Sequence, residues 1–250
     1  MLSEADLETW MLDELAELEW ESVPGATLAP GSGERTTWND IVLHGRLLQS
    51  LRNLNPGVPE AYLQQAITEV ITPKSQSAIA ENERLHAILV HGYNSIEYVD
   101  HDGQMRRPTI RFFSEEPDRN NYVAANQITI RSRDHERRFD IVLYVNGLPL
   151  AIVELKRAGS ATTIENAYNQ LQTYVKEFPM AFRFANIVVA SNDVDARYGT
   201  PFTPFEHFAP WNVDDDGCLA PTETDGGITT KLELLIFGLF NVERFGQLFT

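Results

Sequence analysis

The fold is decided by residues 139–156, which read FDIVLYVNGLPLAIVELK. Two largely apolar runs meet at Asn146-Gly147, and such a dipeptide between apolar runs predicts a β-hairpin with a tight turn. Near-continuous apolar neighbours indicate that both strands are central and buried. Three charged residues stand at the far ends of these strands, namely Asp140, Glu154 and Lys156. Charges in a buried strand are costly unless they are paired or bind a metal, so these three residues mark a candidate site.

The register of the hairpin decides whether Asp140 joins the other two residues. Glu154 and Lys156 are two positions apart, so on a strand they project from the same face, roughly 7 Å apart. A plain two-residue loop would pair Asp140 with Val153 and turn its side chain away from Glu154. A shift by one residue, through a three-residue loop with Gly147 in the left-handed conformation or through a β-bulge, brings Asp140 onto the face of Glu154. The site hypothesis therefore requires that shift.

If the three side chains converge, they favour metal-dependent hydrolysis of a phosphodiester. Two carboxylates form an oxygen-lined site for a hard cation such as Mg²⁺, which keeps several waters. Such a metal polarises a phosphate and lowers the pKa of a bound water, and Lys156 would orient that water and stabilise charge building on phosphorus. The alternative is an ordinary ion pair between Glu154 and Lys156 at a sheet edge. Because Asp140 stands at the matching strand end, the residues favour the catalytic interpretation and this alternative equally.

The rest of the chain predicts an α/β fold with a mixed sheet. Ser3, with Asp6 three residues later, caps a first helix whose apolar stripe contains Leu7, Met11, Leu15 and Leu18. Helices are expected over residues 39–55, 59–71, 77–91 and 163–177, and strands over residues 95–99, 109–113, 127–131, 139–145, 148–155 and 186–190. A loop is expected over residues 24–37, and another follows the strand at 186–190 and ends at about 228. Residues 231–249 form a last amphipathic stretch.

Composition narrows the class of protein. The net charge is −16 over 250 residues, which argues against a protein that coats nucleic acid through bulk charge. The charge is uneven: residues 1–22 hold eight acids and no base, whereas residues 101–140 hold eight Arg and no Lys. Those Arg are either a surface for phosphates or partners of neighbouring acids. The single Cys218 excludes a disulfide framework and suits a reducing cytoplasm, and no apolar run is long enough to span a membrane.

Further segments carry a family resemblance beyond the hairpin. They are SEADLE at residues 3–8, Asn126-Gln127, AYNQLQTY at residues 167–174 and GLFN at residues 238–241. Together with the Asp…Glu-x-Lys spacing, which resembles the PD-(D/E)xK nuclease superfamily, they make nearly the whole chain look like the N-terminal endonuclease domain of the restriction (R) subunit of type I restriction–modification enzymes. The Gln-x-x-x-Tyr element is typical of that family, whereas Phe139 departs from the Pro in the superfamily name.

The resemblance implies a fold and a metal centre. The fold would be a central mixed β-sheet flanked by helices, with a restriction-endonuclease-like core and an N-terminal helical elaboration. Asp140 and Glu154 would be metal ligands, with the Leu155 carbonyl as a third, and Lys156 would be the catalytic lysine.

It also implies supporting residues around that centre. Gln170 and Tyr174 lie four apart on the expected helix, so they share a face and would support the centre or hold DNA near it. Core packing of Tyr174 and a surface position of Gln170 are the alternatives. An acid from the first helix often completes such sites, and Glu8 is the first choice and Glu4 the second.

Domains and partners follow from the same resemblance. Residues 1–230 would form the endonuclease domain, with a helical insertion at about 39–91 and a catalytic core at about 94–192. Residues 231–250 would lead into an ATP-driven motor domain, and their apolar face would pack on something beyond residue 250. The chain has no Gly-x-x-x-x-Gly-Lys-[Ser/Thr] loop, so Mg²⁺ is its expected cofactor and ATP is expected only for the complete enzyme. The expected partners are double-stranded DNA, the methyltransferase and specificity subunits and the motor domain, in a bacterial or archaeal cytoplasm and without a membrane.

Three hypotheses of function remain at the level of the sequence. The first is the nuclease domain of a type I restriction subunit, which cuts unmodified DNA after ATP-driven translocation. The second is a stand-alone repair or junction-resolving nuclease with the same core. The third is a non-cleaving module that docks the motor subunit onto its partner subunits.

Overall fold

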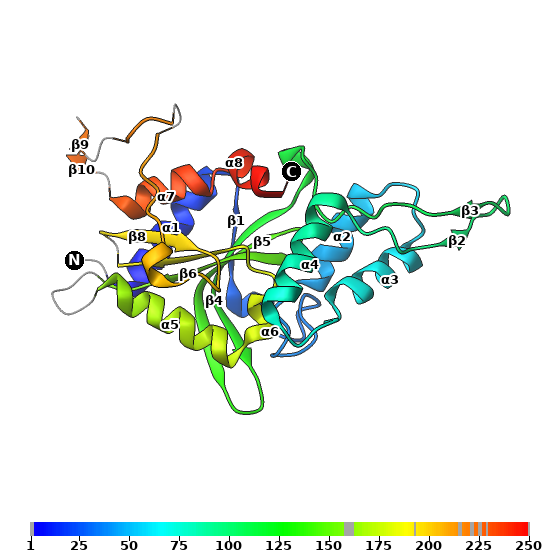
Figure 1. Ribbon diagram of the computed structural model, residues 1–250, viewed down its shortest axis with the longest axis horizontal. Helices are drawn as coiled ribbons and strands as arrows, with labels where there is room; N and C mark the ends of the chain where they lie inside the picture. Colours follow the sequence, from blue (N-terminus) through cyan, green and yellow to red (C-terminus); the bar gives the residue numbers. More distant parts are fainter. Residues whose placement is uncertain are drawn as a thin grey trace.

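A six-stranded mixed sheet crosses the centre of the molecule in the computed structural model (Figure 1). The structure describes residues 3–157, 163–192, 194–214, 217–220, 223–224, 227–228 and 230–249. The sheet order is β1-β4-β5-β6-β7-β8, in which β1 runs parallel to β4 and β6 parallel to β7, while the other neighbours are antiparallel. The strands are β1 (Glu21–Pro24), β4 (Tyr122–Arg131), β5 (Glu136–Val145), β6 (Leu148–Leu155), β7 (Ile187–Ser191) and β8 (Ala196–Gly199). The expected α/β layout with a mixed sheet is confirmed.

Helices cover both faces of the sheet. Figure 1 shows α5 (Ile164–Glu177) on one side, and α1 (Glu4–Glu17) and α7 (Lys231–Leu239) on the other. Three helices gather at one end, α2 (His44–Leu54), α3 (Glu60–Ile71) and α4 (Ala78–His91), and a thin hairpin of β2 (Tyr98–Val99) and β3 (Met105–Arg106) extends beyond them. The remaining short elements are α6 (Pro179–Phe182), α8 (Val242–Gly246), the strand pair β9 (Glu223–Thr224) and β10 (Gly227–Ile228), and the 3-10 turns Gly25–Leu28, Pro117–Arg119, Phe205–His207 and Gln247–Phe249.

The first helix forms as its sequence predicts. The Ser3 hydroxyl accepts a hydrogen bond from the Asp6 N–H, and the Asp6 carboxylate accepts one from the Ser3 N–H, which completes a capping box. Leu7, Met11 and Leu15 are buried against the core. The predictions of helices over 59–71, 77–91 and 163–177 are likewise confirmed by α3, α4 and α5.

Three local predictions were wrong. The helix expected from residue 39 begins only at His44, because the preceding segment is tied to other groups: the Asp40 carboxylate accepts from the Val42 N–H, and the Leu43 N–H donates to the Gly147 carbonyl at 2.9 Å. The strand expected over 109–113 is only a single bridge, between Ile110 and Tyr93. The strand expected over 95–99 is paired only at β2.

Two edge strands were not predicted. β1 was not predicted as a strand, because Glu21–Pro24 carries two exposed polar residues and ends on Pro. Its last residue, Pro24, was expected to begin a loop. β8 lies within the segment expected to be a loop, and its residues are mostly half-buried. Edge strands show little apolar periodicity because only part of their surface is covered.

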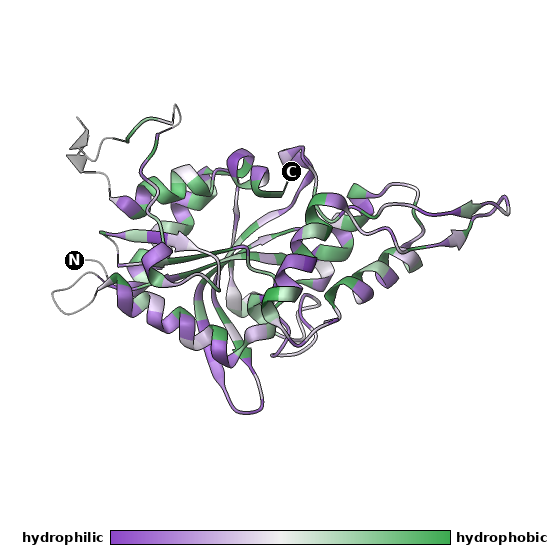
Figure 2. Cartoon of the chain, in the orientation of Figure 1, coloured by the Kyte–Doolittle hydropathy of each residue, from purple (hydrophilic) through white to green (hydrophobic). Residues whose placement is uncertain are grey.

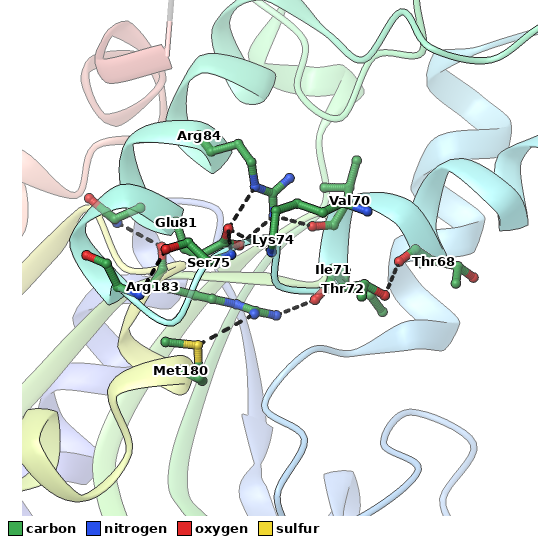
Figure 3. Close-up of polar contacts among 12 residues, drawn as sticks. Thr68, Val70, Ile71, Thr72, Lys74, Ser75, Glu81, Arg84, Met180 and Arg183 are labelled. Atoms are coloured by element: carbon green, nitrogen blue, oxygen red, sulfur yellow. Dashed lines mark hydrogen bonds and ion pairs between the residues drawn. The ribbon is translucent and has the colours of Figure 1, made fainter.

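Buried polar contacts attach the three-helix end to the rest of the molecule (Figure 3). The last carbonyls of α3, those of Val70 and Ile71, accept hydrogen bonds from Arg84 and from Arg183, respectively. Glu81 on α4 pairs with Arg84 at 2.7 Å and accepts from the N–H groups of residues 74 and 75. Cationic side chains at a helix C-terminus satisfy carbonyls that have no partner within the helix. Arg183, just after α6, thereby joins the helical segment to the sheet side of the fold.

The segment 231–249 belongs to the same core. Figure 2 shows apolar residues concentrated in the sheet and on the inward sides of the helices. Leu235, Phe240 and Phe245 are fully buried in the cluster that also contains the sheet residues, and the Trp20 indole N–H donates to the Phe240 carbonyl at 2.8 Å. The expectation that this segment leaves its apolar face for something beyond residue 250 was therefore wrong, because α1 and the residues after it cover that face.

Candidate active site

A β-bulge brings Asp140 opposite Glu154. The β5–β6 hairpin closes with Asn146 at φ +53° and Gly147 at φ +83°, and its first pairs join Val145 to Leu148 and Tyr144 to Pro149. The following pairs are Leu143↔Ala151, Val142↔Ile152 and Ile141↔Val153, so Leu150 is an extra residue in β6. The next position along β5, Asp140, therefore lies opposite Glu154, and directly opposed side chains share a face. The register shift that the site hypothesis required is present.

The hairpin turn is anchored in the core. Both turn residues adopt positive φ, as a two-residue turn of this kind requires. A Cβ atom on Gly147 would lie 2.5 Å from the Leu43 carbonyl oxygen, so only glycine fits. Asn146 is fully buried, accepts from the Asn121 N–H at 2.8 Å and donates to the Phe112 carbonyl at 3.0 Å. These contacts fix the turn and, through the bulge, the position of Asp140 relative to Glu154.

The three charged residues form one cluster at the end of β6. Lys156 Nζ donates to Glu154 Oε1 at 2.6 Å and to the Leu155 carbonyl at 3.2 Å. Asp140 Oδ2 accepts from the Leu155 N–H at 2.8 Å. Glu154 is fully buried, and its second oxygen, Oε2, accepts no hydrogen bond from any described residue. The structure thus brings together Asp140, Glu154 and Lys156, together with the Leu155 carbonyl.

Burial and mutual repulsion perturb the two carboxyl groups. Burial, followed by the negative charge of Asp140, raises the pKa of Glu154 to about 8 in spite of Lys156. Burial also raises the pKa of Asp140, and the Leu155 N–H opposes this shift. Burial works against the charge of Lys156, but the charge and the hydrogen bond of Glu154 leave the pKa of Lys156 raised. Two carboxyl groups whose burial and proximity disfavour their charge are a set that a cation would stabilise.

Both candidate acids of the first helix face this cluster. Glu8 is buried and accepts from Gln127 Nε2 with both carboxylate oxygens at 2.6 Å. Burial raises the pKa of Glu8, the Gln127 hydrogen bond lowers it, and the negative charge of Asp140 raises it further. Glu4, one turn earlier, is exposed, and its charge acts on Asp140 and Lys156. Glu8 is therefore the better-held of the two.

Gln170 and Tyr174 form a hydrogen-bonded pair on α5. Gln170 Nε2 donates to the Tyr174 hydroxyl, and the Tyr174 ring packs on Phe139 with their centroids 5.4 Å apart. Burial raises the pKa of Tyr174, and the negative charge of Glu154 adds to the shift. The charges of Glu154, Asp140 and Lys156 all act on Tyr174, so this pair lies near the cluster. Tyr174 is also buried in the core.

The donor set fits a hard divalent cation. Glu154 offers an orphaned buried carboxylate oxygen beside Asp140, and the Leu155 carbonyl adds a neutral oxygen. Oxygen ligands of this kind suit Mg²⁺. The described residues hold no group of three or more His, Cys, Asp or Glu side chains arranged to hold a metal, so such a site would consist of two carboxylates and a carbonyl, completed by water.

Gln127 lies next to the cluster, but the sequence assigned it no role beyond its part in the family resemblance. Its contact with Glu8 joins positions 119 residues apart, and no local spacing announces it. The local signal is a pair of amides, Asn126 and Gln127, between the apolar residues Ala125 and Ile128.

Half of the eight Arg residues of the middle segment are paired with acids. Arg106 pairs with Asp100, Arg107 with Glu97, Arg131 with Glu136 and Arg137 with Glu177, at distances of 2.6 to 2.9 Å. For these four residues, pairing with acids accounts for their charge. Arg133 and Arg138 make no ion pair with a described residue, and the charge of Arg138 acts on Glu8.

The fold and the site define an α/β protein with a buried acidic cluster and a lysine at the end of a central hairpin. Residues 1–207 match the family model described as the N terminus of the type I restriction enzyme R protein. The chain belongs to this family, which confirms the resemblance found in the sequence.

Curated relatives carry the same family name. The chain is 31% identical over 221 residues to the type I restriction enzyme HindI endonuclease subunit of Haemophilus influenzae, covering 86% of this chain and 21% of that protein. It is 26% identical over 252 residues to the putative type I restriction enzyme MjaIXP endonuclease subunit of Methanocaldococcus jannaschii, covering 95% of this chain and 24% of that protein. The chain therefore spans about a fifth to a quarter of the length of these relatives. None of its described helices is long and apolar enough to cross a membrane.

Proposed function

We propose that this chain is the Mg²⁺-dependent endonuclease domain of a type I restriction R subunit, built on a PD-(D/E)xK core, and that it hydrolyses phosphodiester bonds of unmodified DNA. The observation that carries the proposal is the bulge-shifted register, which places Asp140 beside Glu154 in a buried cluster with Lys156. A buried acidic pair of this kind has no purpose in a docking module. The family match favours the R subunit over a stand-alone repair nuclease.

Each residue of the cluster has a chemical task. Asp140, Glu154 and the Leu155 carbonyl would hold the cation, which supplies a polarised phosphate and a bound water that ionises readily. Lys156 presents its ammonium where it can stabilise negative charge at phosphorus or orient the attacking water. Gln170 and Tyr174 would support the cluster from α5, through the packing of Tyr174 on Phe139.

The contacts of Lys156 overlap with the oxygens proposed to hold the cation. Its ammonium lies on Glu154 Oε1 and on the Leu155 carbonyl. Lys156 therefore satisfies part of the same oxygen set, and its flexible side chain would let the ammonium turn toward a phosphate if a cation were held by these oxygens.

The wider assignment follows the relatives. In the complete subunit, ATP-driven translocation by a motor domain would bring DNA to this domain, and methyltransferase and specificity subunits would supply recognition. The divisions proposed for the chain are 1–230 for the endonuclease domain, with a helical insertion at about 39–91 and a core at about 94–192, and 231–250 for the connection to the motor. The proposed location is a bacterial or archaeal cytoplasm.

Mg²⁺-dependent nicking of supercoiled DNA tests the proposal. Asp140→Ala, Glu154→Ala and Lys156→Ala should each reduce nicking by at least about 100-fold, since each removes a ligand or the charge that stabilises the transition state. Lys74→Ala and Glu165→Ala, which alter exposed charges elsewhere, are matched controls and should behave like the native chain. Isothermal titration with Mn²⁺ should show binding that Asp140→Ala abolishes. Residual nicking that is equal in all the variants would contradict the proposal.

A further inference from the structure

The hairpin of β4 and β5 ends in an arm that carries more positive than negative charge. Residues 131–138, here called the basic arm, hold four Arg and two acids, in a chain whose net charge is −16. The strands pair as far as Arg131 and Glu136, and the turn between them forms the lowest part of the molecule in Figure 1, beyond α5 and α6. A protruding segment whose charge is opposite in sign to that of the whole chain suits an anionic partner.

Two of the four Arg residues hold the basic arm in place. The Arg131 guanidinium lies 4.3 Å from the centroid of the Trp38 ring and pairs with Glu136 at 2.7 Å. Arg137 pairs with Glu177, the last residue of α5, at 2.8 Å. The charges of these two Arg residues are therefore matched, and their contacts attach the arm to the rest of the molecule.

The other two Arg residues are exposed and face the solvent with unmatched charge. Neither Arg133 nor Arg138 makes an ion pair with a described residue. Arg138 precedes Asp140 by two positions on β5, so the two side chains share a face, roughly 7 Å apart. Phe139 between them packs on α5, so they lie on the opposite face, and both of their charges act on Glu8 of α1. Arg138 therefore presents a positive charge close to Asp140, and Arg133 presents a second one farther along the arm.

We propose that Arg133 and Arg138 bind backbone phosphates of double-stranded DNA on one side of the bond that is cut, and so align the DNA with the Asp140 cluster. The proposal rests on the proposed function, because it needs that cluster to act on DNA. Each DNA strand carries one phosphate per about 3.4 Å of helix axis, so Arg138, roughly 7 Å from Asp140, would contact a phosphate within about two nucleotides of the cut. A guanidinium suits this task, since its planar fork donates two hydrogen bonds to one phosphate.

The salt dependence of DNA binding tests the proposal. Fluorescence anisotropy of a labelled duplex measures binding to the 250-residue chain, with Ca²⁺ in place of Mg²⁺. Each lost phosphate contact should reduce the slope of log affinity against log salt by about 0.9. We expect this reduction in Arg133→Gln and in Arg138→Gln, each with an affinity about 10-fold lower, and about twice the reduction in the double variant. Arg138→Lys keeps the charge and should keep the native slope.

The β2–β3 hairpin supplies matched controls. Arg106→Gln and Arg107→Gln remove the same charge from exposed Arg residues that are already paired with acids, so they should leave slope and affinity unchanged. Equal losses in these controls would overturn the proposal, because they would reflect net charge alone. Native slope and affinity in Arg133→Gln and Arg138→Gln would also overturn it and would favour an acidic protein as the partner of the arm. Native chain that binds no DNA at low salt would contradict it as well.

Nicking assays separate the basic arm from the proposed function. With Mg²⁺, Arg138→Gln should raise KM by about 10-fold and leave kcat within about threefold of native, because Arg138 binds DNA away from the reacting atoms. Asp140→Ala should abolish nicking and keep the native salt slope. Weakened DNA binding in the Arg variants, combined with equal residual nicking in the native chain and Asp140→Ala, would overturn the proposed function but not DNA binding by the arm. Loss of nicking in Asp140→Ala with native DNA binding in the Arg variants would overturn the arm alone.

Discussion

The hydroxyl of Tyr174 offers a quantitative test of how α5 supports the site. Tyr174 is 5% exposed, its ring packs on Phe139, and its hydroxyl accepts a hydrogen bond from Gln170. Tyr174→Phe keeps the ring and removes only that hydrogen bond, so the expected loss of unfolding free energy is about 1 kcal/mol. For a chain of this size, the thermal midpoint should fall by about 2–4 °C. Tyr174→Ala also removes the packing on Phe139 and should cost about 3–5 kcal/mol.

A double-mutant cycle measured by urea unfolding isolates this contact. The four proteins are the native chain, Tyr174→Phe, Gln170→Ala and the double variant. Because the Gln170 amide donates directly to the Tyr174 hydroxyl, the coupling energy should be about 0.5–1 kcal/mol. A coupling near zero would mean that the hydrogen bond contributes nothing in solution. A loss above about 3 kcal/mol in Tyr174→Phe would mean that the hydroxyl belongs to a larger buried network.

Nicking assays on the same variants then separate support from direct participation. If Tyr174 acts by packing on Phe139 next to Asp140, Tyr174→Phe should retain at least about a tenth of native nicking, in line with its small loss of stability. Tyr174→Ala should lose nicking together with stability. A loss of more than about 100-fold in Tyr174→Phe, with a loss of only about 1 kcal/mol in stability, would refute the supporting role and place the hydroxyl on the substrate or the metal.

Three other outcomes follow from the structure. Gly147→Ala should lower the free energy of unfolding by about 2–4 kcal/mol, because of the positive φ and a clash with the Leu43 carbonyl. Gly57→Ala, at φ +87° with nothing within 4 Å of the added Cβ atom, should lower it by only about 1 kcal/mol. Equal losses in the two variants, measured by urea unfolding, would contradict the packing argument. Trp20→Phe leaves the buried Phe240 carbonyl without its donor and should cost about 1–3 kcal/mol in a single cooperative transition, while a separate early transition of residues 231–249 would show that they are not part of one core. Burial and Asp140 raise the pKa of Glu154 to about 8 from an ordinary 4.5, so the folded chain binds a proton that the unfolded chain releases; its stability without divalent cations should fall as the pH rises from about 5 to 8, and Glu154→Gln should lack that part of the fall. Parallel thermal midpoints of the two proteins between pH 5 and pH 9 would contradict this.

The sequence predicted the two hairpin strands better than their register. Asn146-Gly147 between apolar runs is a local signal, and it identified β6 with both ends correct and β5 with its last residue correct but its start three residues too late. The bulge at Leu150 was only a requirement of the site hypothesis. When both faces of a strand are buried, apolar residues such as Leu148, Leu150 and Ile152 do not reveal an extra residue. Pro149, which lacks an N–H and so disturbs a ladder, is the one local hint.

Contacts between distant segments were beyond sequence reasoning. Gly25 packs against the peptide of Gln127, where a Cβ atom would lie 3.0 Å from the carbonyl carbon, only because β1 lies parallel to β4. β1 itself is too short and polar to be predicted. The choice of Glu8 over Glu4 likewise depends on burial, which a helix with eight acids in its vicinity does not reveal. Helix α2 was predicted too long because periodicity continues through residues 39–43, while the Leu43 N–H is used by the Gly147 carbonyl.

The net charge of −16 takes on a different meaning once the acids are placed. Glu4 and Glu8 of the acidic first helix act on the Asp140 cluster, so some of that charge belongs to the site itself. Under the proposed function, the carboxyl groups of the cluster outnumber its cations, Lys156 and Arg138, so without a bound metal the cluster would not attract a phosphate backbone. A bound divalent cation would reverse this balance at the point where the phosphate must approach. Four Arg of the middle segment are already paired with acids, which would leave the cation as a main attraction for DNA at the proposed site. The net charge that argues against coating of nucleic acid through bulk charge is therefore compatible with a metal-dependent nuclease site.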